Sequence, residues 1–199
     1  MSDNKVDLTP AAQRLADLVA RVTDDELSGP TPCPAYTLGD LIEHVGGLAL
    51  AFRAAAEKDV ASPRVGEAPP GDVTRLEAGW RERIPADLAA LAQAWAKPEA
   101  WAGTTRIAGQ DQPAEIVGVV AADELVVHGW DVARATGQPY SAEPELLDAA
   151  RTFLGFFASP DAPAGPEVAF GPSRPVADSS APLDQVVALA GRDPAWAAR

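Results

Sequence analysis

Apolar residues recur at helical spacing along most of this chain, and the pattern predicts an almost entirely helical protein. One face of an α-helix repeats at positions i, i+3, i+4 and i+7, and glycines and prolines interrupt the repeat where the chain leaves the helix. On this basis we expect helices at about residues 10–27, 37–59, 72–97, 113–137, 143–157 and 182–190. Pro85, inside the third of them, predicts a kink or a break.

Short sequence signals support several of these helix ends. Thr9 followed by Pro10 is typical of an N-cap and the first helical residue. Thr37, with Asp40 three residues later, is a variant of the capping box. Gly137 has no Cβ, which suits the left-handed conformation that ends many helices.

Two segments lack the helical repeat. Residues 99–112 hold two threonines and an isoleucine between glycines, which favours a short extended excursion before the fourth helix. Prolines become frequent after Ser159, where residues 168–170 are expected to form a brief strand. We therefore predict an all-α fold: a four-helix bundle with a fifth helix over residues 1–159, and a small irregular C-terminal extension over 160–199 packed on it.

Composition agrees with closely packed helices. A chain of 199 residues is long enough for one domain, and 47% apolar residues are enough for its core. Alanine occupies 41 positions and aromatic residues only 6% of the chain. This mixture favours helices that approach each other closely over a β-sandwich, which needs more β-branched and aromatic residues.

Charge and cysteine content narrow the class of protein. The net charge of −13 opposes binding to nucleic acid and to anionic membranes. No apolar run approaches the roughly 20 residues of a membrane span, and the first residues do not resemble a signal peptide. The single Cys33 excludes an intrachain disulfide and a cysteine-rich zinc site. We expect a cytoplasmic protein, monomeric or homodimeric, that binds neither nucleic acid nor membrane.

Ionisable residues interrupt two apolar helix faces. His44 lies in the apolar stripe of the second expected helix, and the stripe of the fourth continues through Glu124, His128 and Asp131. Burying such groups without partners costs several kcal/mol, on the order of the transfer energies of polar groups, so each needs a partner.

A metal ion is one partner that satisfies them. Glu124 and His128 are four residues apart and project from one helix face. His44, from a neighbouring helix, would complete three ligands, and three protein ligands leave a position for water or substrate, as in catalytic zinc sites. Two alternatives remain: the histidines pack as hydrogen-bonded core residues, or Glu124 pairs with His128 alone.

Further polar residues have two interpretations each. Asp40 and Asp131 could orient the histidines as acceptors behind a metal, since metal-bound imidazoles donate their other N–H. Asp40 could instead cap its helix, and Asp131 could pair with Arg134. For Cys33 we favour a buried packing role. Three arginines could meet an acidic substrate or a thiol, although exposure to solvent is their default interpretation: Arg134, Arg174 and Arg192.

The residues around these histidines resemble a known family. Two segments carry the resemblance, TPCPAYTLGDLIEHV at 31–45 and DELVVHGWDVARATG at 123–137. They are similar to motifs of the mycothiol-dependent maleylpyruvate isomerase-like, DinB-like metal-binding proteins. The tail LAGRDPAW at 189–196 resembles the end of a metal-binding subfamily.

The resemblance implies a DinB-like four-helix bundle with a divalent metal, zinc or nickel, bound by the residues that match the family's ligands: His44, Glu124 and His128. It further implies mycothiol as a possible cofactor, used for S-transfer or isomerisation of a small electrophilic substrate. The alternative function is a non-catalytic metal-binding or interaction module, in which the ion only holds the helices together.

Overall fold

The computed structural model describes residues 5–66, 69–156, 158–159 and 171–198. Its helices and strands confirm the predicted all-α fold with one small extended excursion. Short 3-10 turns lie at Asp24–Glu26, Pro63–Val65, Val73–Arg75 and Pro98–Trp101. The helices are α1 (Thr9–Val19), α2 (Leu38–Ala56), α3 (Trp80–Trp95), α4 (Ala114–Ala135), α5 (Pro144–Gly155) and α6 (Pro182–Leu189).

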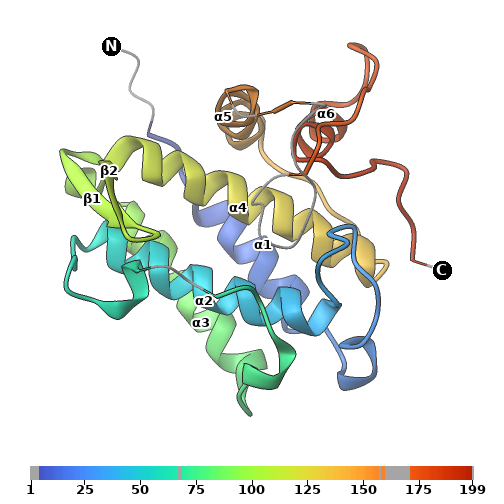
Figure 1. The fold of residues 1–199 in the computed structure, drawn as a ribbon, viewed down its shortest axis with the longest axis horizontal. Coiled ribbons are helices and arrows are strands. Elements are labelled where there is room, and N and C mark those ends of the chain that lie inside the picture. The colour runs from blue at the N-terminus through green and yellow to red at the C-terminus, as the bar shows by residue number, and fades with distance from the viewer. Residues whose placement is uncertain (1–4, 67–68, 157, 160–170, 199) are drawn as a thin grey trace.

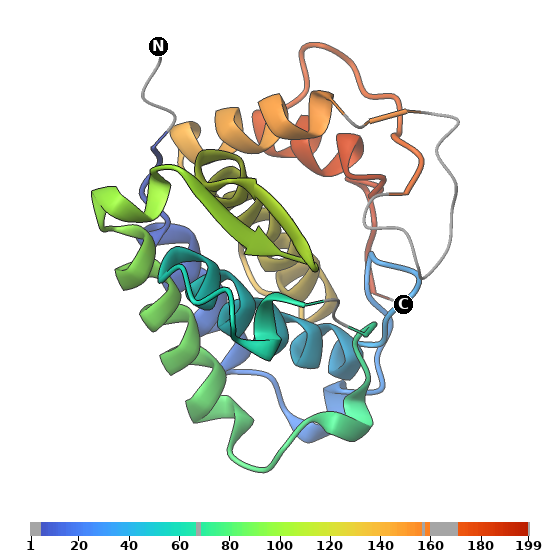
Figure 2. The ribbon, with the colours of Figure 1, turned by 60° about the vertical axis from the view of Figure 1, so that its left-hand side comes forward.

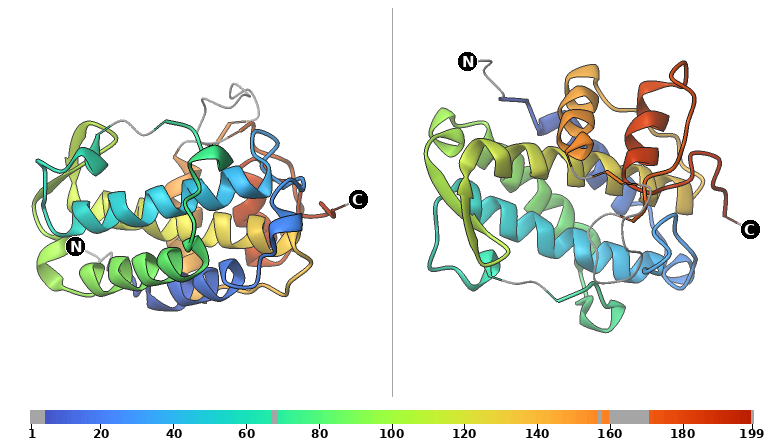
Figure 3. Two further views of the ribbon diagram at one scale, coloured as in Figure 1. Left: turned by 90° about the horizontal axis from the view of Figure 1, so that it is seen from below. Right: turned by 45° about the horizontal axis from the view of Figure 1, so that its top comes forward.

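Helices α1 to α4 form a four-helix bundle. Around its circumference the order is α1, α3, α2 and α4, and α4 then contacts α1 again. Figure 1 shows α2 and α4 running side by side, and the left view of Figure 3 shows α1 and α3 beneath them. Helices α5 and α6 pack on each other and on the side of α4 that faces away from α2 (Figure 1). Helix α4 is therefore covered on both sides.

Alanines and a pair of tryptophans build much of the core. Ala11, Ala55 and Ala121 are fully buried, so neighbouring helices approach each other closely. The rings of Trp95 and Trp101 meet edge to face, with centroids 5.1 Å apart. Both indole N–H groups donate to backbone carbonyls, so the two buried rings leave no unpaired donor.

The extended excursion is a two-stranded hairpin. Strands β1 (Thr104–Ile107) and β2 (Gln110–Pro113) pair antiparallel, with Thr105 opposite Gln112. Figure 2 shows the hairpin lying across the bundle, in front of α4. The buried Thr105 hydroxyl donates to the carbonyl of Ala55, 2.6 Å away, and thereby ties the hairpin to the last turn of α2.

Two predicted helix boundaries are wrong. The first helix ends at Val19 rather than near residue 27, because Thr23 and Glu26 form a capping box that starts a new turn. The third helix begins at Trp80 rather than near 72, because the Asp72 side chain caps a separate 3-10 turn. The helix continues through Pro85, which removes one backbone donor without ending it.

The C-terminal extension packs through α6. Its Val186 and Val187 are fully buried, and α6 contacts both α5 and α4. Gly137 has a φ of +66°, as predicted for the end of α4. The brief strand expected at 168–170 lies outside the described residues, and the division of the chain at residue 159 stays a prediction. Among the described helices, none combines the length and the apolar character that a membrane span requires.

A pair of glycine substitutions tests the packing of α4. A Cβ on Gly118 would lie 2.4 Å from the ring of Trp101, whereas one on Gly47 in α2 meets nothing within 4 Å. Gly118→Ala should lower the free energy of unfolding by roughly 1–3 kcal/mol through overpacking. Gly47→Ala should raise it by about 0.5–1 kcal/mol, because alanine is the better helix former. Denaturant unfolding measures both, and equal stabilities would contradict the tight Gly118–Trp101 contact.

Candidate metal centre

The three side chains predicted to bind a metal come together between α2 and α4. One ligand atom from each of His44, Glu124 and His128 lies within 4.8 Å of the other two. The rings of the two histidines are nearly perpendicular, with centroids 5.1 Å apart. Nε2 of His128 lies 2.9 Å from Oε2 of Glu124. The arrangement could hold a metal ion, and the ion pair that the sequence left as an alternative uses two of the same atoms.

Local sequence signals place these groups. The hydroxyl of Thr37 accepts the N–H of Asp40, and the Asp40 carboxylate accepts the N–H of Thr37, so a complete capping box sets the start of α2. His44 then follows in the second turn, on the face that meets α4. Glu124 and His128 lie one turn apart near the middle of α4, where a spacing of four residues aligns them.

Burial and neighbouring charges separate the pKa values of the two histidines. Burial, together with the positive charge on His128, lowers the pKa of His44 to about 4. Burial also opposes the charge on His128, but hydrogen bonds to Asp131 and Glu124 outweigh it and raise its pKa to about 9. At neutral pH, His44 is therefore neutral, and His128 is protonated on both ring nitrogens and positively charged.

Asp131 lies behind His128. Its Oδ2 is 3.1 Å from Nδ1 of His128, and its side chain is fully buried. Its partner on the other side is Arg192 at 3.0 Å, and not Arg134, the partner the sequence offered. The prediction that Arg192 is exposed to solvent is wrong, because only 6% of this residue is exposed. Arg134 instead donates to the carbonyl of Pro194 and lies over the ring of Trp130.

Asp40 accepts hydrogen bonds at the start of its own helix, α2. Its Oδ2 accepts from the backbone and hydroxyl of Thr37, and its Oδ1 accepts from the N–H of Val73. These contacts make it a capping residue that also holds the loop before α3. A role for Asp40 in orienting His44 stays a prediction.

Tyr36 and the loop around it cover His44. The ring of Tyr36 lies 5.4 Å from that of His44, and its hydroxyl accepts the N–H of Gly71. The buried Thr31 hydroxyl donates to the carbonyls of Cys33 and Tyr36 and holds the loop in shape. Burial raises the pKa of the Cys33 thiol, which agrees with a packing role rather than a reactive one.

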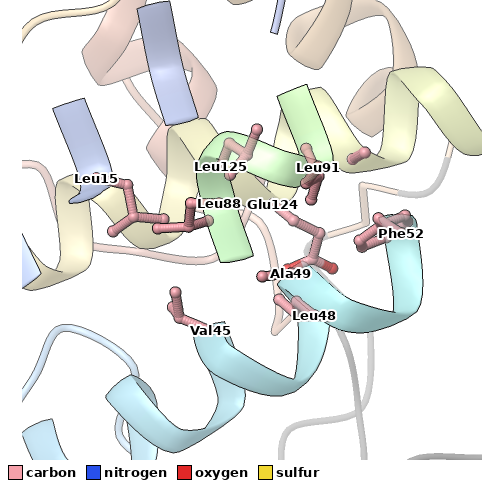
Figure 4. A pocket seen from close by; sticks show the side chains of 10 residues that line it. Leu15, Val45, Leu48, Ala49, Phe52, Leu88, Leu91, Glu124 and Leu125 are labelled. Carbon is pink, nitrogen blue, oxygen red and sulfur yellow. The ribbon is translucent and has the colours of Figure 1, made fainter. Parts of the chain in front are cut away.

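A small apolar cavity adjoins the other side of the site. Its volume is about 10 Å³, close to the room that one water molecule needs. Figure 4 shows the Glu124 side chain reaching into it from α4, opposite Ala49 and Leu48 of α2. Apart from Glu124, its lining is apolar: Leu15, Val45, Leu48, Ala49, Phe52, Leu88, Leu91, Ala121 and Leu125.

Asp123 is a buried polar residue that the sequence pattern did not identify. It is fully buried, and both carboxylate oxygens lack a hydrogen-bond partner among the described residues. Burial raises its pKa well above the usual range. It lies beside Glu124 on α4, outside the stripe that faces α2, so the apolar periodicity gave no signal for it.

Known proteins are similar to this chain along most of its length. A sequence model of the mycothiol maleylpyruvate isomerase N-terminal domain matches residues 8–133. Proteins from two strains of Mycobacterium tuberculosis, both named uncharacterized, are 33% identical over 188 residues, which is 92% of this chain and 93% of theirs. These relatives therefore share the C-terminal extension as well as the bundle.

A solved structure shares the fold. The crystal structure of the mycothiol-dependent maleylpyruvate isomerase aligns with a TM-score of 0.54 and 17% identity over 73% of this chain. A variant of that enzyme, with one histidine changed to alanine, aligns with a TM-score of 0.56. The alignment spans 65% of the isomerase chain, so about a third of that protein has no counterpart here.

Substitution of Asp123 tests how much the burial of its carboxylate, without a hydrogen-bond partner among the described residues, destabilises the protein. Leucine has the same branching without polar atoms, so where its added volume fits, Asp123→Leu should raise the free energy of unfolding by roughly 1–3 kcal/mol, the cost of an unsatisfied buried polar group. The folded pKa of Asp123 lies above its unfolded value, so the wild-type protein loses stability as the pH rises between the two. The advantage of the variant should therefore be larger at pH 8 than at pH 5.

Thermal unfolding at the two pH values measures this effect. Asp123→Asn is the control that removes the titration but keeps a polar group, so it should flatten the pH dependence with a smaller gain. Leucine and asparagine variants that are both less stable than wild type at both pH values would show that the carboxylate has a stabilising partner.

Proposed function

This chain belongs to the mycothiol maleylpyruvate isomerase N-terminal domain family, and on that premise we propose that it is a metal-dependent enzyme that uses a thiol. The thiol is mycothiol, and the reaction is S-transfer to, or isomerisation of, a small electrophilic substrate. The observation that carries this proposal is the group of three donors, His44, Glu124 and His128, within 4.8 Å of one another.

The donor set fits a divalent transition metal. Two imidazoles and one carboxylate suit zinc or nickel, and the geometry favours neither. Three protein ligands leave coordination positions for a thiol or a substrate. A cation bound there would supply the positive charge that stabilises a thiolate at neutral pH.

The protein's own residues prepare the site for this chemistry. The Glu124 carboxylate places a negative charge next to both histidines, and Asp131 faces Nδ1 of His128 and leaves Nε2 directed toward Glu124. The Tyr36 ring covers His44 and limits its contact with water. Low exposure strengthens each of these electrostatic interactions. A location in the cytoplasm, where thiols are kept reduced, remains part of the proposal.

Metal binding should release about one proton per chain at pH 7. His128, with a pKa of about 9, holds a proton that competes with the metal, whereas His44, with a pKa of about 4, does not. The affinity should therefore rise with pH up to about 9. Calorimetric titration with Zn²⁺ in two buffers of different ionisation enthalpy measures the protons released. Release of none, or of two, would contradict these protonation states.

Thiol binding should depend on the metal. We expect one metal per chain by elemental analysis, and calorimetry should detect mycothiol binding to the loaded protein only. Glu124→Gln should lose the metal and the thiol together, while Glu115→Gln, at an exposed position of the same helix, should keep both. Circular dichroism should show both variants helical, because each change preserves shape and helix propensity.

The outcomes separate the proposal from its alternative. Metal bound without affinity for mycothiol would favour the non-catalytic module, in which the ion only joins α2 to α4. Absence of stoichiometric metal from the wild-type protein would overturn the metal centre itself.

A further inference from the structure

The segment that follows α6 brings a buried arginine to the metal centre. Gly191 turns the chain with a φ of +82°, a backbone conformation that residues other than glycine rarely adopt. Arg192 then enters the interior, where 6% of it is exposed. Its Nη1 donates to the carbonyl of Ala190 at 2.7 Å, and the guanidinium faces Asp131 of α4.

Arg192 and His128 share one carboxylate. Nη2 of Arg192 lies 3.0 Å from Oδ2 of Asp131, and its Nε lies 3.4 Å from Oδ1, so both oxygens face the guanidinium. The same Oδ2 is 3.1 Å from Nδ1 of His128. A continuous, buried line of contacts therefore runs from the C-terminal extension to a metal-binding side chain.

We propose that Arg192 is a positioning residue for the metal centre, which holds the Asp131 carboxylate and through it the ring of His128. The inference rests on the proposed function, since it concerns the metal site named there. A guanidinium presents two parallel N–H groups to a carboxylate, whereas a lysine ammonium is a single point of charge. A carboxylate behind a metal-bound histidine fixes the orientation of the ring, and such contacts change metal affinity by about 10- to 100-fold.

Attachment of the tail does not by itself require Arg192. Arg174 donates to the carbonyl of Gly191 at 3.0 Å, and Arg134 donates to the carbonyl of Pro194. These two arginines hold the same segment by contacts outside the metal centre. Of the three, Arg192 is the one that pairs with Asp131. It lies beyond residues 8–133, the part that matches the family model.

The test compares matched arginine variants. Arg192→Lys keeps the charge and loses the two-point contact, so it should lower the affinity for Zn²⁺ by about 10- to 100-fold. Arg174→Lys makes the same change at an exposed arginine that lies before α6 and holds the same segment, and its affinity should equal that of wild type. Equal affinity of Arg192→Lys and wild type, or an equal loss in both variants, would overturn the proposal.

A double-variant cycle tests the route through Asp131. If Arg192 acts through this carboxylate, Arg192→Lys should cause no further loss of Zn²⁺ affinity once Asp131→Asn is present. Losses that simply multiply in the double variant would show that Arg192 acts by another route and would overturn the proposal.

Nitrogen NMR of the imidazole rings reports the position of His128 directly, and a general loss of stability would not shift the signals of His128 alone. The chain has only two histidines, so their ring signals are readily assigned. Arg192→Lys should shift the Nδ1 signal of His128 and leave the His44 signals in place. In the metal-loaded wild-type protein, His128 should keep a proton on Nδ1, facing Asp131. A metal bound at Nδ1 would overturn the proposal even if the lysine variant does not fold.

Failure of the proposed function is distinguishable from failure of this inference. If the wild-type protein binds no Zn²⁺, the metal centre is refuted, and the metal-free His128 signals still decide the positioning role. If wild type binds Zn²⁺ and Arg192→Lys binds it equally well with unchanged His128 signals, only the inference about Arg192 fails.

Discussion

The interaction on which the rest of this structure depends is the pairing of ionisable side chains inside a helical bundle. Glu124, His128 and Asp131 occupy one face of α4, and each would destabilise the fold if it were buried alone. Hydrogen bonds through both ring nitrogens of His128 link the three groups. The partners lie four and three residues apart on the same helix, so the helical repeat of α4 itself brings them into contact and makes burial of this face tolerable.

The segment after the second layer of helices contributes to the same pairing. Asp131 and Asp123 are fully buried on α4, and the four helices of the bundle supply no countercharge for Asp131 besides His128 among the described residues. Helices α5 and α6 cover the side of α4 that faces away from α2 (Figure 1), and the segment after α6 supplies Arg192 as the countercharge for Asp131. Asp123 has no such partner among the described residues, and burial raises its pKa. The extension thus completes the electrostatics of the bundle as well as covering it.

Sequence periodicity predicted the features that depend on local pattern and failed for those that depend on tertiary contact. The apolar stripes through His44 and His128 placed both on faces that meet, since a polar residue within a core stripe has few other places to lie. The first helix is shorter than its apolar pattern predicted, because the capping box of Thr23 and Glu26 starts a new turn after Val19. Arg192 gave no periodic signal, because it lies after a glycine turn in an irregular segment and its partner is 61 residues away along the chain.

The pairing also bears on the role of a metal in this protein. In structural zinc sites the ion contributes folding energy outright. Here His128 bonds to two carboxylates, and Glu124 accepts from His128, so their burial is compensated by protein contacts alone. His44, with its pKa lowered to about 4, is stable in the interior as a neutral ring. The charges of Glu124 and His128 are thus compensated by contacts within the protein, so we expect the bundle to fold without an ion.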